Sequence, residues 1–237
     1  MGSVFRKQKF DEDGYNGERC MSNVLVELRQ KIDEIDHALL ELVTRRLNVS
    51  REIATAKPNG SPVYRPAREA LLMHQLLSQL DGTVEHKVVE RLWRVLLASS
   101  VHSQRPNFKI ISLEGLEDFT SEFSASFLDF TFCSTGDHII KQLSENQADV
   151  AFFPYSELAE IASSLGEKTG IYLNHKMDNV AIICKNMPEE TGFDISLFRD
   201  SSFVEPSIIE KPGFSLNSDS SAHVHIGAWV NLSSALK

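Results

Sequence analysis

Apolar residues recur every three or four positions from residue 28 to residue 56. They stand at Leu28, Ile32, Ile35, Leu39, Leu42, Val49, Ile53 and Ala56. Alternating steps of four and three are typical of a helix that carries a heptad stripe. The pattern predicts one helix from about residue 23 to about residue 57, which would be about 50 Å long at 1.5 Å per residue. A stripe on so long a helix needs a partner surface to cover it.

Two shorter helices follow, because the pattern resumes after a turn. Pro58 ends the first helix, since its ring removes a backbone donor, and Pro66 suits the first turn of the next. We expect a helix at about 66 to 80 and another at about 84 to 104. Polar residues continue the apolar line in both, so we expect them to point inward. The first stripe is Glu69, Met73, Leu76 and Leu80, and the second is Val89, Leu92, Leu96, Ser100 and Gln104.

An arginine interrupts the stripe of the long helix. Arg46 stands where the next apolar residue is expected, and a cation there is costly to bury unless an anion meets it. Lys57 lies on the same face, about 20° around the helix and about 16 Å along it. Arg29 is about 100° away and about 25 Å along, so it cannot share a small ligand with Arg46 in one straight helix. We therefore expect Arg29, if it is functional, to serve the site of another subunit.

The second half of the chain has a different pattern and a different charge. Short apolar runs, "FKIISL", "ADVAFF", "DNVAIIC" and "HVHIGAW", predict strands, and "STGDHIIKQLSENQ" predicts a helix that leads into one of them. Residues 22 to 106 carry 12 Lys+Arg and 10 Asp+Glu, whereas residues 107 to 237 carry 8 and 19. We therefore predict a helical domain at 22–106, an α/β domain at 107–237 and a disordered extension at 1–21, with Met21 as a possible true start.

Composition excludes several classes of function. The helical half is only weakly basic and poor in interleaved aromatic residues, which argues against nucleic-acid binding. No segment approaches the roughly 20 apolar residues of a membrane span, and the N-terminus has no apolar core of a signal peptide. The three cysteines, Cys20, Cys133 and Cys184, lack CxxC spacing, so we expect neither disulfides nor a zinc site and predict a cytoplasmic protein.

The helical half resembles the all-helical class of chorismate mutases. The stretch "LRQKIDEIDHALLELVTRRLNVSREIATAK" has Arg29, Arg46 and Lys57 at the family's spacing. "PVYRPARE" supplies the Arg-Glu pair, Arg68 and Glu69, and "ASSVHSQ" supplies a serine and, four residues on, a glutamine, Ser100 and Gln104. Seven positions are thus in register over about 85 residues.

The resemblance implies a three-helix, intertwined homodimer that converts chorismate to prephenate without metal or cofactor. Arg46 would bind one substrate carboxylate, and Arg29 of the second subunit the other. Lys57 and Gln104 would donate to the ether oxygen, which becomes negative as its bond breaks. The resemblance also implies that Arg68 orients a carboxylate, Glu69 holds the ring hydroxyl and Ser100 supports a carboxylate.

Two alternatives remain open. Isochorismate pyruvate lyases share this fold and much of the cationic pocket, and a catalytically degenerate helical dimer could present a ligand-sensing α/β domain. Arg65 also departs from the family, which often has an acidic residue at that position near the substrate hydroxyl.

The acidic half weakly resembles the prephenate dehydratase module, whose fold is periplasmic-binding-like. The family's Thr-Arg-Phe signature is absent, because the comparable strand reads "NHKMDNVAIICKN". We therefore expect a dehydratase-like α/β domain that does not dehydrate prephenate. His223 and His225 alternate along one run as a metal pair can, but ordinary strand histidines explain that spacing better, and we predict no metal.

Overall fold

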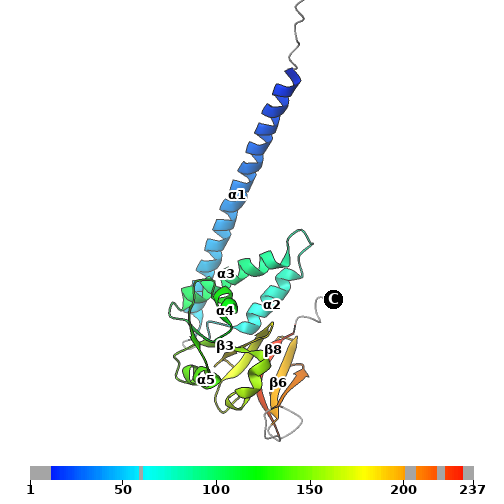
Figure 1. Cartoon of the computed structure of the whole chain (residues 1–237). Helices are drawn as coiled ribbons and strands as arrows, with labels where there is room; N and C mark the ends of the chain where they lie inside the picture. The colour runs from blue at the N-terminus through cyan, green and yellow to red at the C-terminus, as the bar shows by residue number, and fades with distance from the viewer. Residues whose placement is uncertain (1–11, 59–60, 201–206, 218–221, 232–237) are drawn as a thin grey trace, which may run out of the picture. The chain divides into compact units, whose positions relative to one another are not determined.

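The computed structural model describes residues 12–58, 61–200, 207–217 and 222–231. The chain forms two compact units, residues 1–49 and residues 50–237, and each is described by itself (Figure 1).

The first unit consists of most of a single helix, α1 (Glu12–Ala56), whose last turns belong to the second unit. The predicted long helix is therefore confirmed, and it begins about ten residues earlier than expected, where the sequence predicts a disordered extension. Extending an existing helix costs far less than starting one, which accounts for the earlier start. Residues 1–11 of the predicted extension lie outside the described residues. The stripe residues from Leu28 to Leu42 are 49–61% exposed in the single chain.

Two helices of the second unit follow the turn after α1. Helix α2 (Pro66–Leu77) begins at Pro66, as predicted, and α3 (His86–Gln104) ends at Gln104. The inward face of α3 differs in part from the predicted stripe, because Leu92 is 55% exposed while Leu97, Ala98 and Val101 are buried. Val89 and Ser100 of the predicted stripe are buried as expected.

In the described residues that follow α3, eight strands form one mixed sheet, with short helices between some of them. Its strand order is β2-β1-β3-β5-β4-β8-β6-β7. Strands β2, β1 and β3 are mutually parallel, β4 runs parallel to β8, and the other neighbours are antiparallel. The strands are β1 (Lys109–Leu113), β2 (Asp129–Cys133), β3 (Val150–Pro154), β4 (Tyr172–Met177), β5 (Val180–Cys184), β6 (Asp194–Asp200), β7 (Ser207–Pro212) and β8 (His223–Val230). All four predicted strand runs are strands, and an α/β segment follows the helical region as expected.

Both faces of the sheet are covered, so its central strands are apolar on both sides. Ala151 and Phe153 of β3 pack in a cluster with α5 (Gly136–Ser144) and the short helices η1 (Tyr155–Glu160) and η2 (Ala162–Ser164). Val150 and Phe152 of the same strand belong to another cluster, with α4 (Glu117–Ser124) and α3. Successive side chains of a strand point to opposite faces, which separates the two clusters.

The helical segment and the sheet share part of one core. Tyr64, Ala98 and Val101 are buried in the same cluster as Phe123 and Phe152. Ala67 and Ala70 of α2 pack with Val230 of β8. The predicted boundary at Pro106 lies between the end of α3 and the start of β1, and as a division into independent domains it stays a prediction.

No helix in the described part of the chain has both the length and the apolar composition needed to cross a membrane.

Candidate active site

The turn between α1 and α2 brings cationic side chains together. Lys57 directly follows α1, and its backbone N–H donates to the carbonyl oxygen of Ile53 at 3.1 Å. Its ammonium Nζ donates to the carbonyl oxygen of Pro62 at 2.8 Å. Burial lowers the pKa of Lys57, and the positive charges of Arg65 and Arg68 lower it further. An anion that binds beside Lys57 would offset both effects.

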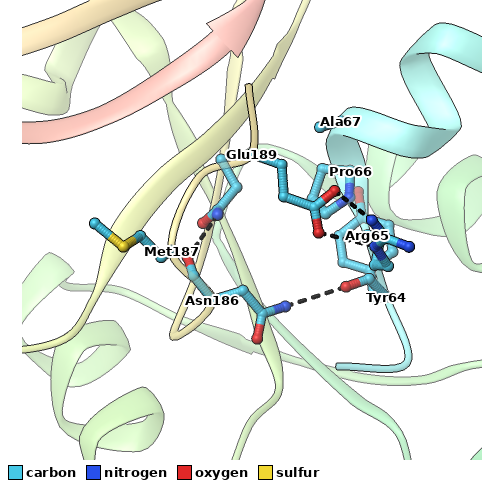
Figure 2. A pocket seen from close by; sticks show the side chains of 8 residues that line it. Tyr64, Arg65, Pro66, Ala67, Asn186, Met187 and Glu189 are labelled. Atoms are coloured by element: carbon cyan, nitrogen blue, oxygen red, sulfur yellow. Dashed lines mark hydrogen bonds and ion pairs between the residues drawn. The ribbon is translucent and has the colours of Figure 1, made fainter. Parts of the chain in front are cut away.

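Arg65 forms a two-pronged ion pair with a loop beyond β5. Its Nε and Nη2 donate to the two carboxylate oxygens of Glu189, each at 2.8 Å, as Figure 2 shows. The hydrogen bond to Glu189 raises the pKa of Arg65. Beside it, Asn186 Nδ2 donates to the carbonyl oxygen of Tyr64 at 3.1 Å. The residue that departs from the family pattern therefore attaches the turn to the α/β segment.

The cleft beside this ion pair is too small for a substrate. It is lined by residues of the turn, of the start of α2, of β4 and of the 186–189 loop, including Tyr64, Arg65 and Glu189 (Figure 2). Its volume is 10 Å³, about the space that one water molecule occupies.

Glu69 lies in the first turn of α2, where the helix N-terminus favours a carboxylate. Its Oε2 accepts a hydrogen bond from Arg94 Nη1 of α3 at 3.0 Å. Both side chains are largely buried, with 15% of Glu69 and 13% of Arg94 exposed. The guanidinium of Arg94 also lies 4.2 Å from the ring centroid of Phe123. Burial, followed by the charge of Glu69, raises the pKa of the adjacent Tyr64 well above its ordinary value.

The end of α3 presents an amide and a hydroxyl. Gln104 Nε2 donates to the hydroxyl oxygen of Ser50 at 2.8 Å, and Ser50 is buried. The Oε1 atom of Gln104 is buried and has no hydrogen-bond partner among the described residues. Ser100 is also buried, and its hydroxyl donates to the carbonyl oxygen of Leu96 in its own helix at 2.7 Å. An amide held by one bond retains further capacity for a polar ligand.

The structure brings some of the predicted residues together and leaves others apart. Lys57 and Arg68 lie close enough for their charges to interact, and Arg68 is exposed on α2. Glu69 pairs with Arg94, which is not among the predicted site residues. Arg29, which is exposed, and Arg46, which is partly buried, lie in the part of α1 that belongs to the first unit. The predicted residues of the second unit thus include two cations, Lys57 and Arg68, and one carboxylate, Glu69.

Two further polar residues in contact with predicted site residues, Arg94 and Ser50, were missed. A signal for Arg94 existed, because it precedes Leu97, Ala98 and Val101 by three, four and seven positions and so shares their buried face. An arginine on an apolar face is the same observation that singled out Arg46. For Ser50 the sequence offers no comparable signal, since an isolated serine in a helix is common.

His223 and His225 of β8 contact a carboxylate and an aromatic ring. His225 packs edge-on against Phe198 with ring centroids 5.5 Å apart, and burial lowers its pKa. His223 Nε2 lies 3.7 Å from a carboxylate oxygen of Asp200. Within the described ranges no group of three or more His, Cys, Asp or Glu side chains is placed to hold a metal ion.

Comparison with known proteins identifies the helical segment. The model of the family described as chorismate mutase type II matches residues 28–105. The chorismate mutase of Methanocaldococcus jannaschii is 33% identical over 79 residues, which cover 32% of this chain and 80% of that protein.

Longer relatives match beyond the helical segment. A bifunctional chorismate mutase/prephenate dehydratase of Pseudomonas aeruginosa is 25% identical over 167 residues, covering 66% of this chain and 44% of the relative. A protein of the same description from Neisseria gonorrhoeae is 27% identical over 146 residues, which cover 60% of this chain and 40% of that relative. The chain therefore spans less than half the length of these two relatives. An alignment over 66% of the chain must include part of the α/β segment, which supports the dehydratase-like resemblance. Through residues 28–105, the chain belongs to the type II chorismate mutase family.

Proposed function

We propose that this chain catalyses the rearrangement of chorismate to prephenate. The observation that carries the proposal is the family match over residues 28–105, within which Arg29, Arg46, Lys57, Arg68, Glu69, Ser100 and Gln104 keep the residue types that the reaction needs. The lowered pKa of Lys57 also supports the proposal, because its causes are burial and the nearby positive charges of Arg65 and Arg68, and an anion beside Lys57 would offset both.

The rearrangement breaks a C–O bond and forms a C–C bond within one molecule, so the protein acts by positioning and by electrostatics. In our proposal, Lys57 Nζ and the Gln104 amide donate to the ether oxygen as it gains negative charge. Arg46, and Arg29 of a second subunit, bind the two carboxylates, because a guanidinium pairs with both oxygens of a carboxylate.

The remaining residues orient the substrate in this proposal. Arg68 and Ser100 support carboxylate binding, and Glu69 accepts a hydrogen bond from the ring hydroxyl. An acceleration of about 10⁶-fold corresponds to about 8 kcal/mol, which a few preorganised charged contacts can supply.

We further propose that the active form is a homodimer. The stripe of α1 leaves Leu28, Ile32, Ile35, Leu39 and Leu42 about half exposed or more in the single chain, and a second copy of the helix would cover them. Light scattering should give twice the chain mass of 26.6 kDa.

Arg29 can be assigned to one subunit or the other by mixing variants. Suppose Arg29→Ala chains and Lys57→Ala chains are unfolded together and refolded in equal amounts. If Arg29 acts across the dimer, each mixed dimer has one intact site, and the mixture should regain about a quarter of the wild-type activity. If Arg29 acts within its own subunit, the mixture stays inactive.

We propose that the α/β segment does not dehydrate prephenate. The hairpin of β4 and β5, residues 172–184, contains no arginine, whereas the dehydratase signature requires one. Formation of phenylpyruvate from prephenate by the purified chain would contradict this. A cytoplasmic location is also our proposal, supported by the two buried, unpaired thiols Cys133 and Cys184.

The function is tested with purified chain by the loss of chorismate absorbance and by separation of the products. Wild-type chain should yield prephenate, and Arg46→Leu should lose at least a hundredfold in kcat/KM because a carboxylate loses its ligand. Arg45→Leu is the matched control, since Arg45 is adjacent and exposed, and it should stay within twofold. Full activity in Arg46→Leu would remove Arg46 from the site.

A further inference from the structure

Arg94 takes no part in the mechanism proposed above, yet it contacts Glu69 directly. Its Nη1 donates to Glu69 Oε2 at 3.0 Å, and little of either side chain is exposed. The other carboxylate oxygen, Oε1, accepts no hydrogen bond from the described residues, so it is left to accept one from a hydroxyl group. The charge-assisted hydrogen bond to Oε2 therefore restrains where the Glu69 carboxylate lies.

Packing alone does not explain an arginine at this position. Its Nε and Nη2 atoms are buried without hydrogen-bond partners among the described residues, which costs stability. Leu97 and Ala98 on the same face of α3 show that this environment accepts apolar side chains. A residue selected for stability alone would be apolar here, and so would its partner at position 69.

The α/β segment holds Arg94 from the other side. The ring of Phe123 in α4 lies 4.2 Å from the guanidinium carbon, a favourable cation–π distance. Phe123 is itself fixed by edge-on contacts with Tyr64, at 5.8 Å, and with Phe152 of β3, at 4.8 Å between ring centroids. Glu69 is therefore linked through Arg94 and Phe123 to the core of the sheet.

We propose that Arg94 is a positioning residue for the rearrangement and that Phe123 is its support. Arg94 holds the Glu69 carboxylate where it meets the ring hydroxyl of chorismate, so the α/β segment contributes to the mutase site without touching the substrate. This inference rests on the proposed function, because it gives Glu69 a substrate contact.

The test measures chorismate turnover by the purified full-length chain. Arg94→Gln should lower kcat ten- to a hundredfold while KM changes less than threefold, since the substrate carboxylates keep their own cations. Arg94→Lys should recover part of the loss, because it restores a donor to Glu69. Arg91→Gln is the matched control on the same helix, where Arg91 is 77% exposed and 3.8 Å from Glu122, and it should stay within twofold.

A double-mutant cycle separates positioning from a general effect. In a Glu69→Gln background, Arg94→Gln should cost less than a further twofold in kcat, because Arg94 acts through Glu69. Phe123→Leu should lower kcat at least fivefold, while Phe119→Leu, in the same helix and the same cluster, should stay within threefold. Thermal melts check that each variant folds. If Arg94→Gln does not fold, the turnover of Arg94→Lys and Phe123→Leu tests the inference.

Three results would overturn the inference. One is a folded Arg94→Gln chain within twofold of wild type, another is an equal loss with and without Glu69, and the third is wild-type turnover in Phe123→Leu. Failure of the proposed function is seen separately, because a wild-type chain that leaves chorismate unchanged would show it before any variant is made.

Discussion

The ion pair between Arg65 and Glu189 should hold the turn that carries Lys57 against the α/β segment. We consider Arg65→Gln, Glu189→Gln and the double variant. Arg65→Gln removes the guanidinium that donates both 2.8 Å hydrogen bonds, and Glu189→Gln leaves one acceptor oxygen and no charge. Each single change leaves one unpaired charge, whereas the double variant leaves none.

The expected coupling energy follows from geometry and exposure. Two-pronged pairing is the strongest form of such a contact, but each side chain is 38% exposed, so solvent screens the pair. Exposed pairs contribute about 0.2–1 kcal/mol, and the geometry places this one at the upper end, at about 1 kcal/mol. Such a loss lowers Tm by about 2–4 °C in a domain of this size.

The assay is urea unfolding of the full chain at one fixed protein concentration, in low and in high salt. The coupling should shrink at about 1 M salt, where the screening length falls to about 3 Å. Arg91 and Glu122 provide the control cycle, because they are 3.8 Å apart and mostly exposed, and their coupling should be close to zero. If the Arg65–Glu189 coupling is no larger than that of the control pair, the contact does not hold the turn.

Three further predictions concern pH and packing. Burial lowers the pKa of His175 from 6.5 to about 4, so between these pH values the unfolded chain binds more protons than the folded chain. The free energy of unfolding should therefore fall by up to about 3 kcal/mol as the pH falls from 6.5 to 4. His175→Gln should flatten this pH dependence in urea titrations, and an unchanged dependence would show that His175 is not its cause. Because the pKa of Lys57 is lowered from 10.5, kcat/KM should fall as the pH rises toward that value. Arg65→Gln removes a nearby positive charge, so it should move this fall to higher pH. If the fall does not move, a group other than Lys57 causes it. A Cβ at Gly227 would stand 2.2 Å from the carbonyl oxygen of Leu173, so Gly227→Ala should lower the free energy of unfolding by about 3 kcal/mol or more. Gly170→Ala, where the Cβ meets open space, should lower it less in the same thermal melts. Equal losses in the two variants would contradict the clash.

Periodicity predicted α1, α2 and α3 because each one has an apolar stripe, whereas the short helix α4 was not predicted. The turn between α1 and α2 was also predicted, since Pro58 and Pro66 determine where one helix ends and the next begins. The start of α1 was not predicted, because little in the sequence before residue 23 distinguishes an extended helix from a disordered tail.

The predicted runs correspond to β1, β3, β5 and β8, whereas β2, β4, β6 and β7 were not predicted. The continuous apolar runs of β3 and β5 come from positions where the sheet is covered on both faces. Strand β2 was missed because it lies at the edge of the sheet, where Phe130 and Phe132 are 39% and 38% exposed and polar residues intervene. Burial on two faces leaves a signal in the sequence that an edge strand lacks.

The residues of the candidate site also differ in whether the sequence alone reveals them. Lys57, Arg68 and Glu69 could be selected because their spacing in one turn has a chemical reason. Phe123 could not, because it contacts Arg94 only through the packing of α4 against α3, which the local pattern does not encode. The partner of Arg65 is likewise 124 residues away.

Chorismate turnover by purified wild-type and Lys57→Ala chains, with the products separated, tests the central claim most directly. The account predicts that the wild type consumes chorismate and yields prephenate alone, and that Lys57→Ala folds but turns over at least a hundredfold more slowly. A wild-type chain that leaves chorismate unchanged, or a Lys57→Ala chain as active as wild type, would contradict it.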